Sequence, residues 1–302
     1  MRVSFPPKIL ALREPGYPRR LLKLEKPPET IAVAGELTSE RTFAIVGTRK
    51  PAADAVAFTR QLAQCIVRHG GIVVSGGAVG IDTAAHEATL DAGGKTWAVA
   101  ATGHRQVFPA ENAALFERIV TGGGAMIWPF PPNKKADPLS FFSRNGVLVA
   151  LSDVVVVVQA AIPSGALNAA AWGRKLGRPI WAVCSPPWAP GFAGCALVLE
   201  RGGRPLTSLG AWLRAVGLTR AGKSVRTRSA PTSMTPPPLP PRNTTPHERA
   251  LLDVLSMTAQ HIDEIAAKSG LCMSALATAL LTLALEDVVV EGPDGFFRRT
   301  MG

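Results

Sequence analysis

The chain has 302 residues, of which 47% are hydrophobic, and its formal net charge is +11. At about 100–200 residues per domain this length predicts two or three domains, and the hydrophobic content excludes an intrinsically disordered chain. The longest apolar runs, such as Val154–Val158, are far shorter than the roughly 18 residues that cross a bilayer. No apolar secretory segment follows Met1, so we expect a cytoplasmic protein without membrane contact.

The charge is unevenly distributed along the chain. Residues 1–216 carry 24 basic and 14 acidic residues, residues 217–246 carry five basic and no acidic ones, and residues 247–302 carry four basic and eight acidic ones. A strongly basic main body indicates a polyanionic partner. The four cysteines show neither a C-x-x-C pair nor zinc-finger spacing, so we expect free thiols and no metal site.

The first 40 residues are expected to form a small separate element, with a helix at Pro18–Leu24 and an extended run at Thr30–Gly35. From 41 to 216, buried apolar runs alternate with helical patterns. The strands are expected at 41–47, 72–77, 96–103, 153–160 and 179–185, and the helices at 53–71, 80–94, 111–123 and 166–177. This alternation predicts an α/β domain with a doubly wound, mostly parallel sheet, which binds ligands at the carboxyl edge of its strands.

Residues 217–246 contain seven prolines and read as an extended basic linker. Residues 247–302 show three helical patterns followed by "DVVVEGPDGFFRR", a predicted hairpin. Three helices and a hairpin predict a winged-helix domain. Since Ser269–Phe297 contains no Lys or Arg, we expect this domain to bind protein rather than DNA.

Four glycine-bearing loops follow strands of the expected sheet: "GTRKP", "SGGAVGID", "ATGH" and "PSGALN". Such loops let backbone N–H groups approach an anion, although βα turns are glycine-rich in many proteins. Four of them at one edge exceed what one phosphate needs. The candidate anion-binding residues are Gly47, Thr48, Arg49, Ser75, Gly76, Gly77, Gly80, Thr102, Gly103, Ser164 and Gly165.

A nucleotide cofactor is poorly supported by these loops. "GGAVGID" is neither a Walker A loop nor a G-x-G-x-x-G turn, and no acidic residue stands about 20 residues later to bind a ribose. We therefore expect no cofactor, and the loops are better suited to a nucleic-acid backbone.

A second group of candidates lies near "KKADPLSFFSRNG". Basic groups beside an aromatic ring hold single strands without reading their sequence. The candidates are Lys134, Lys135, Phe141, Arg144 and Asn145. Phe141 and Phe142 are either stacking residues or core residues, and Lys134 and Lys135 are either DNA contacts or solvated charges.

His86 follows Asp82 by four residues on one helix face. Such a pair is either catalytic or a hydrogen-bonded structural pair, and the sequence offers no nucleophile with a base beside it.

These residues resemble the DNA-processing protein A family (DprA or Smf) of bacterial natural transformation. The family pattern of "AIVGSR", "SGxAxGID", "AAH", "GTG", "P.EN", "RNR" and "SGSL" appears here as "AIVGTR", "SGGAVGID", "AAH", "ATG", "PAEN", "RNG" and "SGAL", in order. The resemblance implies an extended Rossmann-like fold without enzymatic activity, a C-terminal winged helix, and single-stranded DNA bound in a basic pocket. It also implies a homodimer that loads the recombinase RecA onto incoming strands.

The chain departs from the family pattern at several positions, and Thr48, which keeps a hydroxyl, replaces the serine of "AIVGSR". Gly146 replaces the second arginine of "RNR", Pro138 stands where a lysine is usual, and Gln159 replaces a glutamate. The alternatives are an enzyme or a nucleotide-sensing protein, because nucleotide phosphoribohydrolases of the lysine-decarboxylase-like group have a similar sheet. Ala171 stands where their "PGGxGTxxE" motif has its glutamate.

Overall fold

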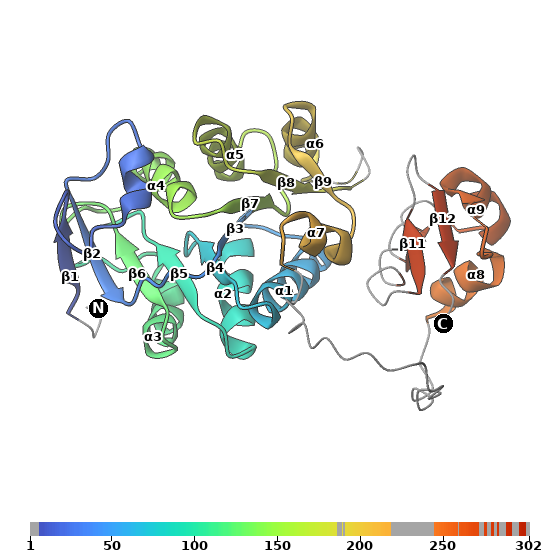
Figure 1. Ribbon diagram of the computed structural model, residues 1–302, viewed down its shortest axis with the longest axis horizontal. Coiled ribbons are helices and arrows are strands. Elements are labelled where there is room, and N and C mark those ends of the chain that lie inside the picture. The colour runs from blue at the N-terminus through green and yellow to red at the C-terminus, as the bar shows by residue number, and fades with distance from the viewer. Residues whose placement is uncertain are drawn as a thin grey trace, which may run out of the picture. The chain divides into compact units, whose positions relative to one another are not determined.

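The computed structural model describes residues 6–185, 189, 191–218, 245–258, 260–271, 275–276, 279–280, 283, 288–291 and 296–299. The chain divides into two compact units, Met1–Leu206 and Thr207–Gly302 (Figure 1). Most of the expected linker, residues 219–244, lies outside the described residues.

The first unit is built on a nine-stranded sheet with the order β1-β2-β6-β5-β4-β3-β7-β8-β9. The seven strands from β6 to β9 in this order are parallel, and β1 and β2 are antiparallel to their neighbours. This confirms the predicted mostly parallel sheet. The strands are β1 (Lys8–Ala11), β2 (Thr30–Gly35), β3 (Thr42–Val46), β4 (Ile72–Ser75), β5 (Thr96–Val99), β6 (Ala125–Trp128), β7 (Val154–Val157), β8 (Ile180–Val183) and β9 (Arg204–Leu206).

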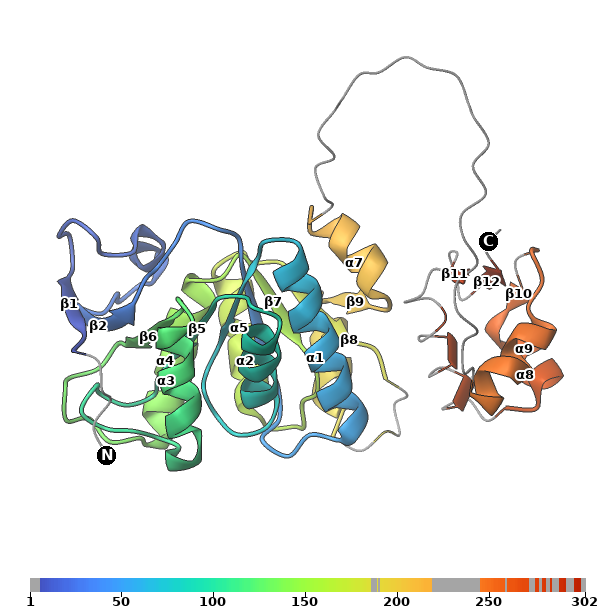
Figure 2. The same cartoon turned by 90° about the horizontal axis from the view of Figure 1, so that it is seen from below.

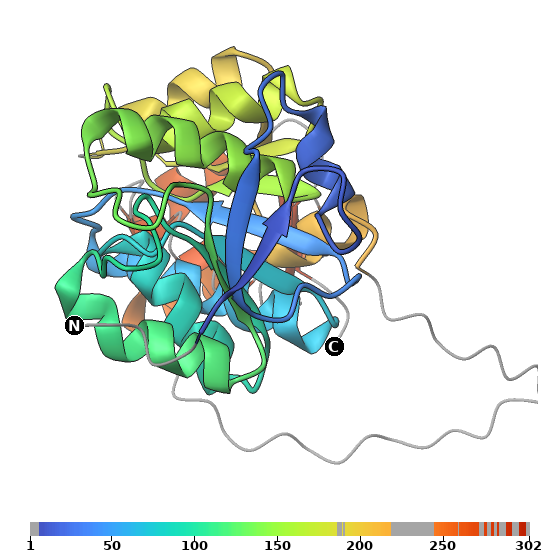
Figure 3. The same cartoon turned by 90° about the vertical axis from the view of Figure 1, so that its left-hand side faces the viewer.

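Helices cover both faces of this sheet, as a doubly wound fold requires. Three helices lie on one face, α1 (Ala53–Arg68), α2 (Ile81–Asp91) and α3 (Ala113–Thr121) (Figures 1 and 2). On the other face lie α4 (Pro138–Ala150), α5 (Gly165–Lys175) and α6 (Ala193–Glu200) (Figure 3). Every residue of β3 and of β7 is buried, because helices pack on both sides of each central strand. In α1, Phe58, Leu62 and Ile66 form the buried stripe at the four-residue spacing of one helix face.

Residues 1–40 differ from the separate element that the sequence suggests. A short 3₁₀ helix, η1 (Arg19–Lys23), stands where a helix is expected, but β2 pairs with β6 and so extends the large sheet. Arg20 ties η1 to the body of the unit through hydrogen bonds to Thr42 Oγ1 and the Leu151 carbonyl and an ion pair of 3.1 Å with Asp153. The boundary expected at residue 40 therefore falls within one sheet.

The strand order places the topological switch point between β3 and β7. From β3 the chain winds outward through β4 and β5 to β6, then α4 carries it back to β7 on the other side of β3, and it winds outward again through β8 to β9. Successive crossovers leave opposite sides of the sheet at such a point and open a crevice at the carboxyl ends of the two strands.

The second unit contains the described part of the winged helix. Its elements are α7 (Leu209–Ala215), α8 (Pro246–Val254), α9 (Ile262–Ser269) and a sheet of β10 (Gln260–His261), β12 (Phe296–Arg299) and β11 (Val289–Glu291). Strands β11 and β12 pair antiparallel, as the predicted hairpin requires. The expected third helix is described at only five residues, and Leu276, Ala279, Leu280 and Leu283 among them belong to the core of this unit.

Among the described residues, no helix combines the length and apolar character that crossing a membrane demands.

Candidate nucleic-acid interface

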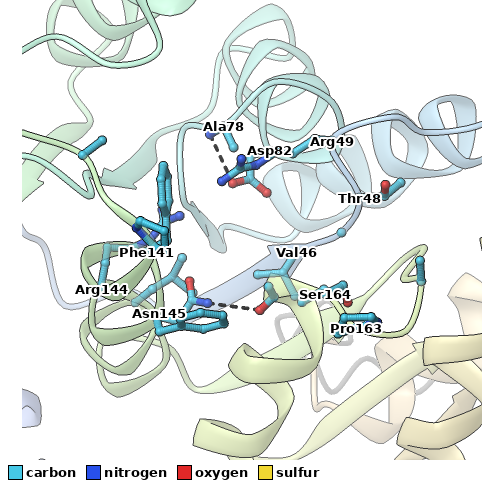
Figure 4. Close-up of a pocket in the computed structure, with 18 of the residues that line it drawn as sticks. Val46, Thr48, Arg49, Ala78, Asp82, Phe141, Arg144, Asn145, Pro163 and Ser164 are labelled. Carbon is cyan, nitrogen blue, oxygen red and sulfur yellow. Dashed lines mark hydrogen bonds between the residues drawn. The ribbon is translucent and has the colours of Figure 1, made fainter.

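A cavity of about 660 Å³ lies at the switch point, between the loop after β3, the first half of α4 and the loop after β7 (Figure 4). Half of the predicted site residues line it: Gly47, Thr48, Arg49, Phe141, Arg144, Asn145, Ser164 and Gly165. The other half do not.

Helix α4 supplies one wall of the cavity, and its start is set by local sequence. Asp137 is the N-cap residue and accepts a hydrogen bond from the backbone N–H of Ser140, whose hydroxyl oxygen accepts one from the N–H of Asp137. Pro138 occupies the first helical position, which its fixed φ favours. The "DPLS" stretch is the signal that a helix begins here. The helix therefore starts before Phe141 and brings Phe141 and Asn145 to the cavity on one face.

Arg49 and Phe141 form the cationic and aromatic centre of the cavity. The Arg49 guanidinium lies over the Phe141 ring, 4.5 Å from its centroid. Phe108 packs edge-to-face on Phe141 with 5.8 Å between ring centroids. Arg49 and its neighbour Lys50 are exposed, and no ion pair joins either to a carboxylate within the described part of the chain. Their positive charges are therefore available to an anionic ligand.

Arg144 has a different role from Arg49, although both line the cavity. Its side chain is buried, and Nη1 donates to the Val99 carbonyl at 2.6 Å. Gly76 makes room for it, since a Cβ on Gly76 would lie 2.5 Å from Arg144 Cζ. Burial lowers the pKa of this guanidinium and the charge of Asp82 opposes that effect. Arg144 therefore supports the loop after β4 more than it offers charge to a ligand.

In the loop at 75–82, the predicted anion contacts are taken up by hydrogen bonds and packing within the protein. The Ser75 hydroxyl is buried and donates to the Ile45 carbonyl at 2.6 Å, and Gly76 and Gly77 are buried as well. Gly80 has φ of +92° and abuts the backbone of Thr48 and Arg49. Only Ala78 and Asp82 of this loop line the cavity. The structure thus places the predicted phosphate contacts of this loop behind the cavity wall.

Asp82 occupies the N-terminal end of α2, where an anion was expected to bind. Its carboxylate accepts a hydrogen bond from the N–H of Ala78 at 3.3 Å (Figure 4). Burial raises the pKa of this carboxyl, while the Arg144 charge and the Ala78 hydrogen bond act in the opposite direction. A carboxylate at a helix N-terminus satisfies the same N–H groups that would bind a phosphate.

Four other predicted residues lie beside the cavity rather than on its wall. Thr102 donates to the Gln106 carbonyl at 3.1 Å, and the N–H of Gly103 donates to the Lys134 carbonyl at 2.9 Å. The Lys134 ammonium pairs with Asp137, and that hydrogen bond lowers the pKa of the Asp137 carboxyl. Lys135 is exposed. Lys134 is therefore neutralised at the rim by the residue that caps α4.

The loop after β7 is open to a ligand. Ser164 is the N-cap residue of α5, and a Cβ built on the exposed Gly165 would meet nothing within 4 Å. Asn145 fixes this end of α5 through hydrogen bonds of 3.1 Å from its Nδ2 to the Gly165 carbonyl and to Asn168 Oδ1. Together with the loop at 47–50, the α5 terminus supplies the groups of the cavity whose chemistry suits an anion.

Lys50 and Gln159 are two polar residues at or beside the cavity that were not among the predicted site residues. Lys50 lines the cavity next to Arg49. Gln159 is buried, and it orders the loop after β3 because its Oε1 accepts from the N–H of Ala52 at 2.9 Å and its carbonyl accepts from the N–H of Thr48 at 2.8 Å. The sequence signal for Gln159 was a polar residue directly after the run of valines at 154–158.

His86 does not pair with Asp82 as the helical spacing suggested. Its Nδ1 lies 2.7 Å from Thr96 Oγ1, which donates its own proton to the Val73 carbonyl. Thr96 therefore accepts from Nδ1–H, and the buried Nε2 has no hydrogen-bond partner within the described residues. Burial and the Arg144 charge lower the pKa of His86 to about 3. His86 is a neutral core residue.

No group of three potential metal-ligating side chains occurs in the described ranges.

The family models match almost the whole chain. "DNA recombination-mediator protein A" matches residues 8–217, and "DprA winged helix domain" matches residues 235–295. Protein Smf of Synechocystis is 28% identical over 97% of this chain and 80% of its own length. DNA processing protein DprA of Bacillus subtilis is 32% identical over 64% of this chain and 65% of its own, and a putative DprA of Mycobacterium tuberculosis is 40% identical over 55% and 43%. The chain thus spans between about two fifths and four fifths of these relatives.

Two solved structures share the fold. DprA of Streptococcus pneumoniae superposes with a TM-score of 0.63 at 28% identity, covering 70% of this chain and 74% of that one. DNA processing protein A of Helicobacter pylori, a protein with a unique single-stranded DNA binding mode, gives 0.64 at 24% identity, covering 72% and 98%. From the order of its motifs, its doubly wound sheet and the model that spans residues 8–217, we conclude that the chain belongs to the DNA recombination-mediator protein A (DprA/Smf) family.

Proposed function

We propose that the protein binds single-stranded DNA in the cavity at the β3/β7 switch point. The observation that carries this proposal is the stacked pair of Arg49 and Phe141, which stands beside the open N-terminus of α5 in one cavity. A cation and a helix N-terminus suit phosphates, and an aromatic ring suits an unpaired base. Membership of a family of DNA recombination mediators supports the same ligand.

The geometry favours a single strand over a duplex. In a duplex the faces of the bases are stacked on one another, whereas Phe141 needs an exposed base face. The cavity lies between the loops after β3 and β7 and the side of helix α4 (Figure 4), whereas a protein that reads a duplex places a helix or strand pair in its groove.

The proposal includes what the family resemblance implies for partners. The protein acts as a homodimer in the cytoplasm and loads a RecA-type recombinase onto the strand that it holds. Contacts to phosphates weaken steeply with salt and can be exchanged one at a time, which suits the release of a bound strand to a recombinase.

The proposal also includes that the protein is not an enzyme. The carboxylates of the cavity are Asp82, which is buried against Arg144, and Asp137, which is paired with Lys134. Ala171 of α5 provides no carboxylate where the phosphoribohydrolases have theirs. Incubation with nucleoside monophosphates should release no free base, and release of base at a rate that depends on Asp82 would establish the enzyme instead.

Titration with a labelled oligothymidylate and with a duplex of equal length tests the main proposal. We expect the single strand to bind at least tenfold more tightly at moderate salt, a difference of about 1.4 kcal/mol. The variant Phe141→Ala should reduce single-strand binding by a similar factor, because one stacked base is worth about 1–3 kcal/mol. Equal affinity for both ligands would contradict the proposal.

A further inference from the structure

A second cavity, of about 490 Å³, lies on the other side of helix α4. The α4 residues that face the first cavity include Phe141 and Asn145, and those that face the second include Ser143 and Gly146. Residues at such offsets point to different sides of a helix. One helix is thus the wall between the two cavities.

Trp172 of α5 provides the aromatic surface of this second cavity. A Cβ on Gly146 would lie 3.0 Å from both Cε2 and Cζ2 of Trp172, so the indole ring packs directly on the α4 backbone. Gly146 is the position at which the family resemblance has an arginine, and here the tryptophan takes that space. Trp172 is only half-buried, and the rest of its ring lines the cavity.

Glu25 and Lys26 line the second cavity and Lys175 lies beside its tryptophan, so two cations and one carboxylate surround it. The Lys175 ammonium lies 5.2 Å from the centroid of the Trp172 ring, and it also pairs with Glu25 at 2.7 Å. Lys26, on the segment after η1, is exposed and lines the cavity. Lys175 beside Trp172 resembles Arg49 beside Phe141 but is paired with a carboxylate, so Lys26 is the cation of this cavity that suits a phosphate next to a stacked base.

An exposed apolar ridge lies on α4 between the two cavities. Leu139 is 79% exposed and Phe142 is 47% exposed. Phe142 borders the first cavity, and Leu139 stands one turn before Ser143 on the side of the second. Single exposed apolar residues are common, but these two form a small patch that a ligand crossing the helix would cover.

We propose that the second cavity holds a nucleobase of the same single strand that occupies the first cavity, stacked on Trp172. The strand crosses α4 over Phe142 and Leu139, and Lys26 contacts a flanking phosphate. This inference rests on the proposed function and extends it from one cavity to a path across the helix.

Strands of two lengths test the inference, one of about 4 nucleotides that fills only the first cavity and one of about 20 that reaches both. We expect Trp172→Ala to weaken binding of the long strand about tenfold, the loss of one stacked base, and to leave binding of the short strand unchanged. Trp172→Phe, which keeps an aromatic ring, should retain most of the long-strand affinity. On the wild-type protein, a long strand with abasic sites should bind less tightly than an intact long strand, because it has no base to stack on Trp172.

Since Trp172→Ala removes a packed side chain, a second variant keeps the test independent of folding. Ser143→Glu places a negative charge at the mouth of the second cavity on an exposed position, and it should cause the same selective loss. If both variants bind the long strand as the wild type does, or lose the short strand equally, the inference is overturned. If the wild type binds neither strand, the proposed function itself fails.

Discussion

At the scale of single residues, two arginines of one cavity have different roles, one toward a ligand and one within the protein. Arg49 is exposed and stacked on an aromatic ring, whereas Arg144 is 5% exposed and bonded to a backbone carbonyl. The sequence does not distinguish them, because both are arginines in segments that were expected to face the same ligand. Burial separates them: a charge that is desolvated and facing Asp82 stabilises the loop at 75–82, and a charge in solvent is free to meet a phosphate.

Loss of Arg144 should therefore affect stability rather than the salt dependence of DNA binding. Arg144→Ala removes the positive charge that offsets the burial of the Asp82 carboxyl, and leaving a buried charge uncompensated costs about 3–5 kcal/mol. We expect a decrease of this size in the free energy of unfolding, measured by urea denaturation. The double variant Arg144→Met, Asp82→Leu should recover most of the loss, since apolar replacement removes both charges. A stable Arg144→Ala protein with weaker, less salt-dependent DNA binding would show that Arg144 contacts phosphate.

His86 should make the fold sensitive to acid. The unfolded chain binds a proton at His86 below about pH 6.5, whereas the folded protein does not until the pH approaches about 3. The contribution of His86 is therefore fully present above pH 6.5 and is lost as the pH falls, by about 2 kcal/mol between pH 7 and pH 5.

Urea unfolding of wild type and His86→Gln at these two pH values measures this effect. The variant is expected to be less stable at pH 7 but to lose less stability on acidification. Parallel losses in the two proteins would mean that His86 takes up a proton in the folded state.

At the scale of elements, the start of α4 couples helix stability to the charge of the site. Asp137 caps α4 and also neutralises Lys134. Asn is as good an N-cap as Asp but carries no charge. Asp137→Asn should therefore keep the helix and free one lysine for a phosphate. We expect tighter binding of single-stranded DNA and a salt slope steeper by about 0.7, measured by fluorescence anisotropy at several salt concentrations.

The matched control is Asp137→Ala, which frees Lys134 but removes the cap. It should cost about 1 kcal/mol of stability while changing the salt slope in the same direction. An unchanged slope in both variants would place Lys134 outside the path of the strand.

Much of the first unit could be predicted from its sequence, because its central strands are apolar runs bounded by glycines. Strands β1, β6 and β9 were not predicted; β6 is a buried inner strand, whereas β1 and β9 lie at the two edges of the sheet. Strand β9 is three residues long and contains Pro205, a residue that sheets tolerate at edges. Strand β1 pairs only with β2, and half of its residues are exposed. Local patterns are weakest in such edge strands.

The site was predictable at the level of loops but not of individual residues. The loops after β3 and β7 were expected at one edge of the sheet, and the strand order brings them together. The sequence does not tell which glycine packs against the protein and which one faces open space. A Cβ on Gly76 would collide with Arg144, 68 positions along the chain, whereas a Cβ on Gly165 would meet nothing within 4 Å. Only tertiary contacts distinguish the two.

At the scale of the whole molecule, the charge is divided between a basic first part and an acidic winged helix. The apolar third helix packs in the core of its own unit at its described positions. After Lys268 the sequence contains no Lys or Arg except Arg298 and Arg299, so this domain offers few cations to phosphates. We therefore expect this domain to bind protein, either the partner subunit or another factor.

Removal of residues 247–302, with the basic linker retained, tests this expectation. Single-strand affinity should stay within about threefold of the full chain, because no DNA contact is lost, and each tenfold corresponds to about 1.4 kcal/mol. Sedimentation velocity on the same samples reports the oligomeric state. A tenfold loss of affinity with an unchanged oligomeric state would show that the winged helix touches DNA.

The central claim is that the switch-point cavity, and not basic charge in general, holds the strand. The most direct measurement compares Arg49→Ala with Lys95→Ala by titrating oligothymidylate at several salt concentrations. Lys95 is an exposed cation just before β5, at the opposite edge of the parallel sheet, so both variants lose one positive charge. Arg49→Ala should weaken binding and lower the salt slope by about 0.7, and Lys95→Ala should match the wild type. Equal behaviour of the two variants would contradict the account.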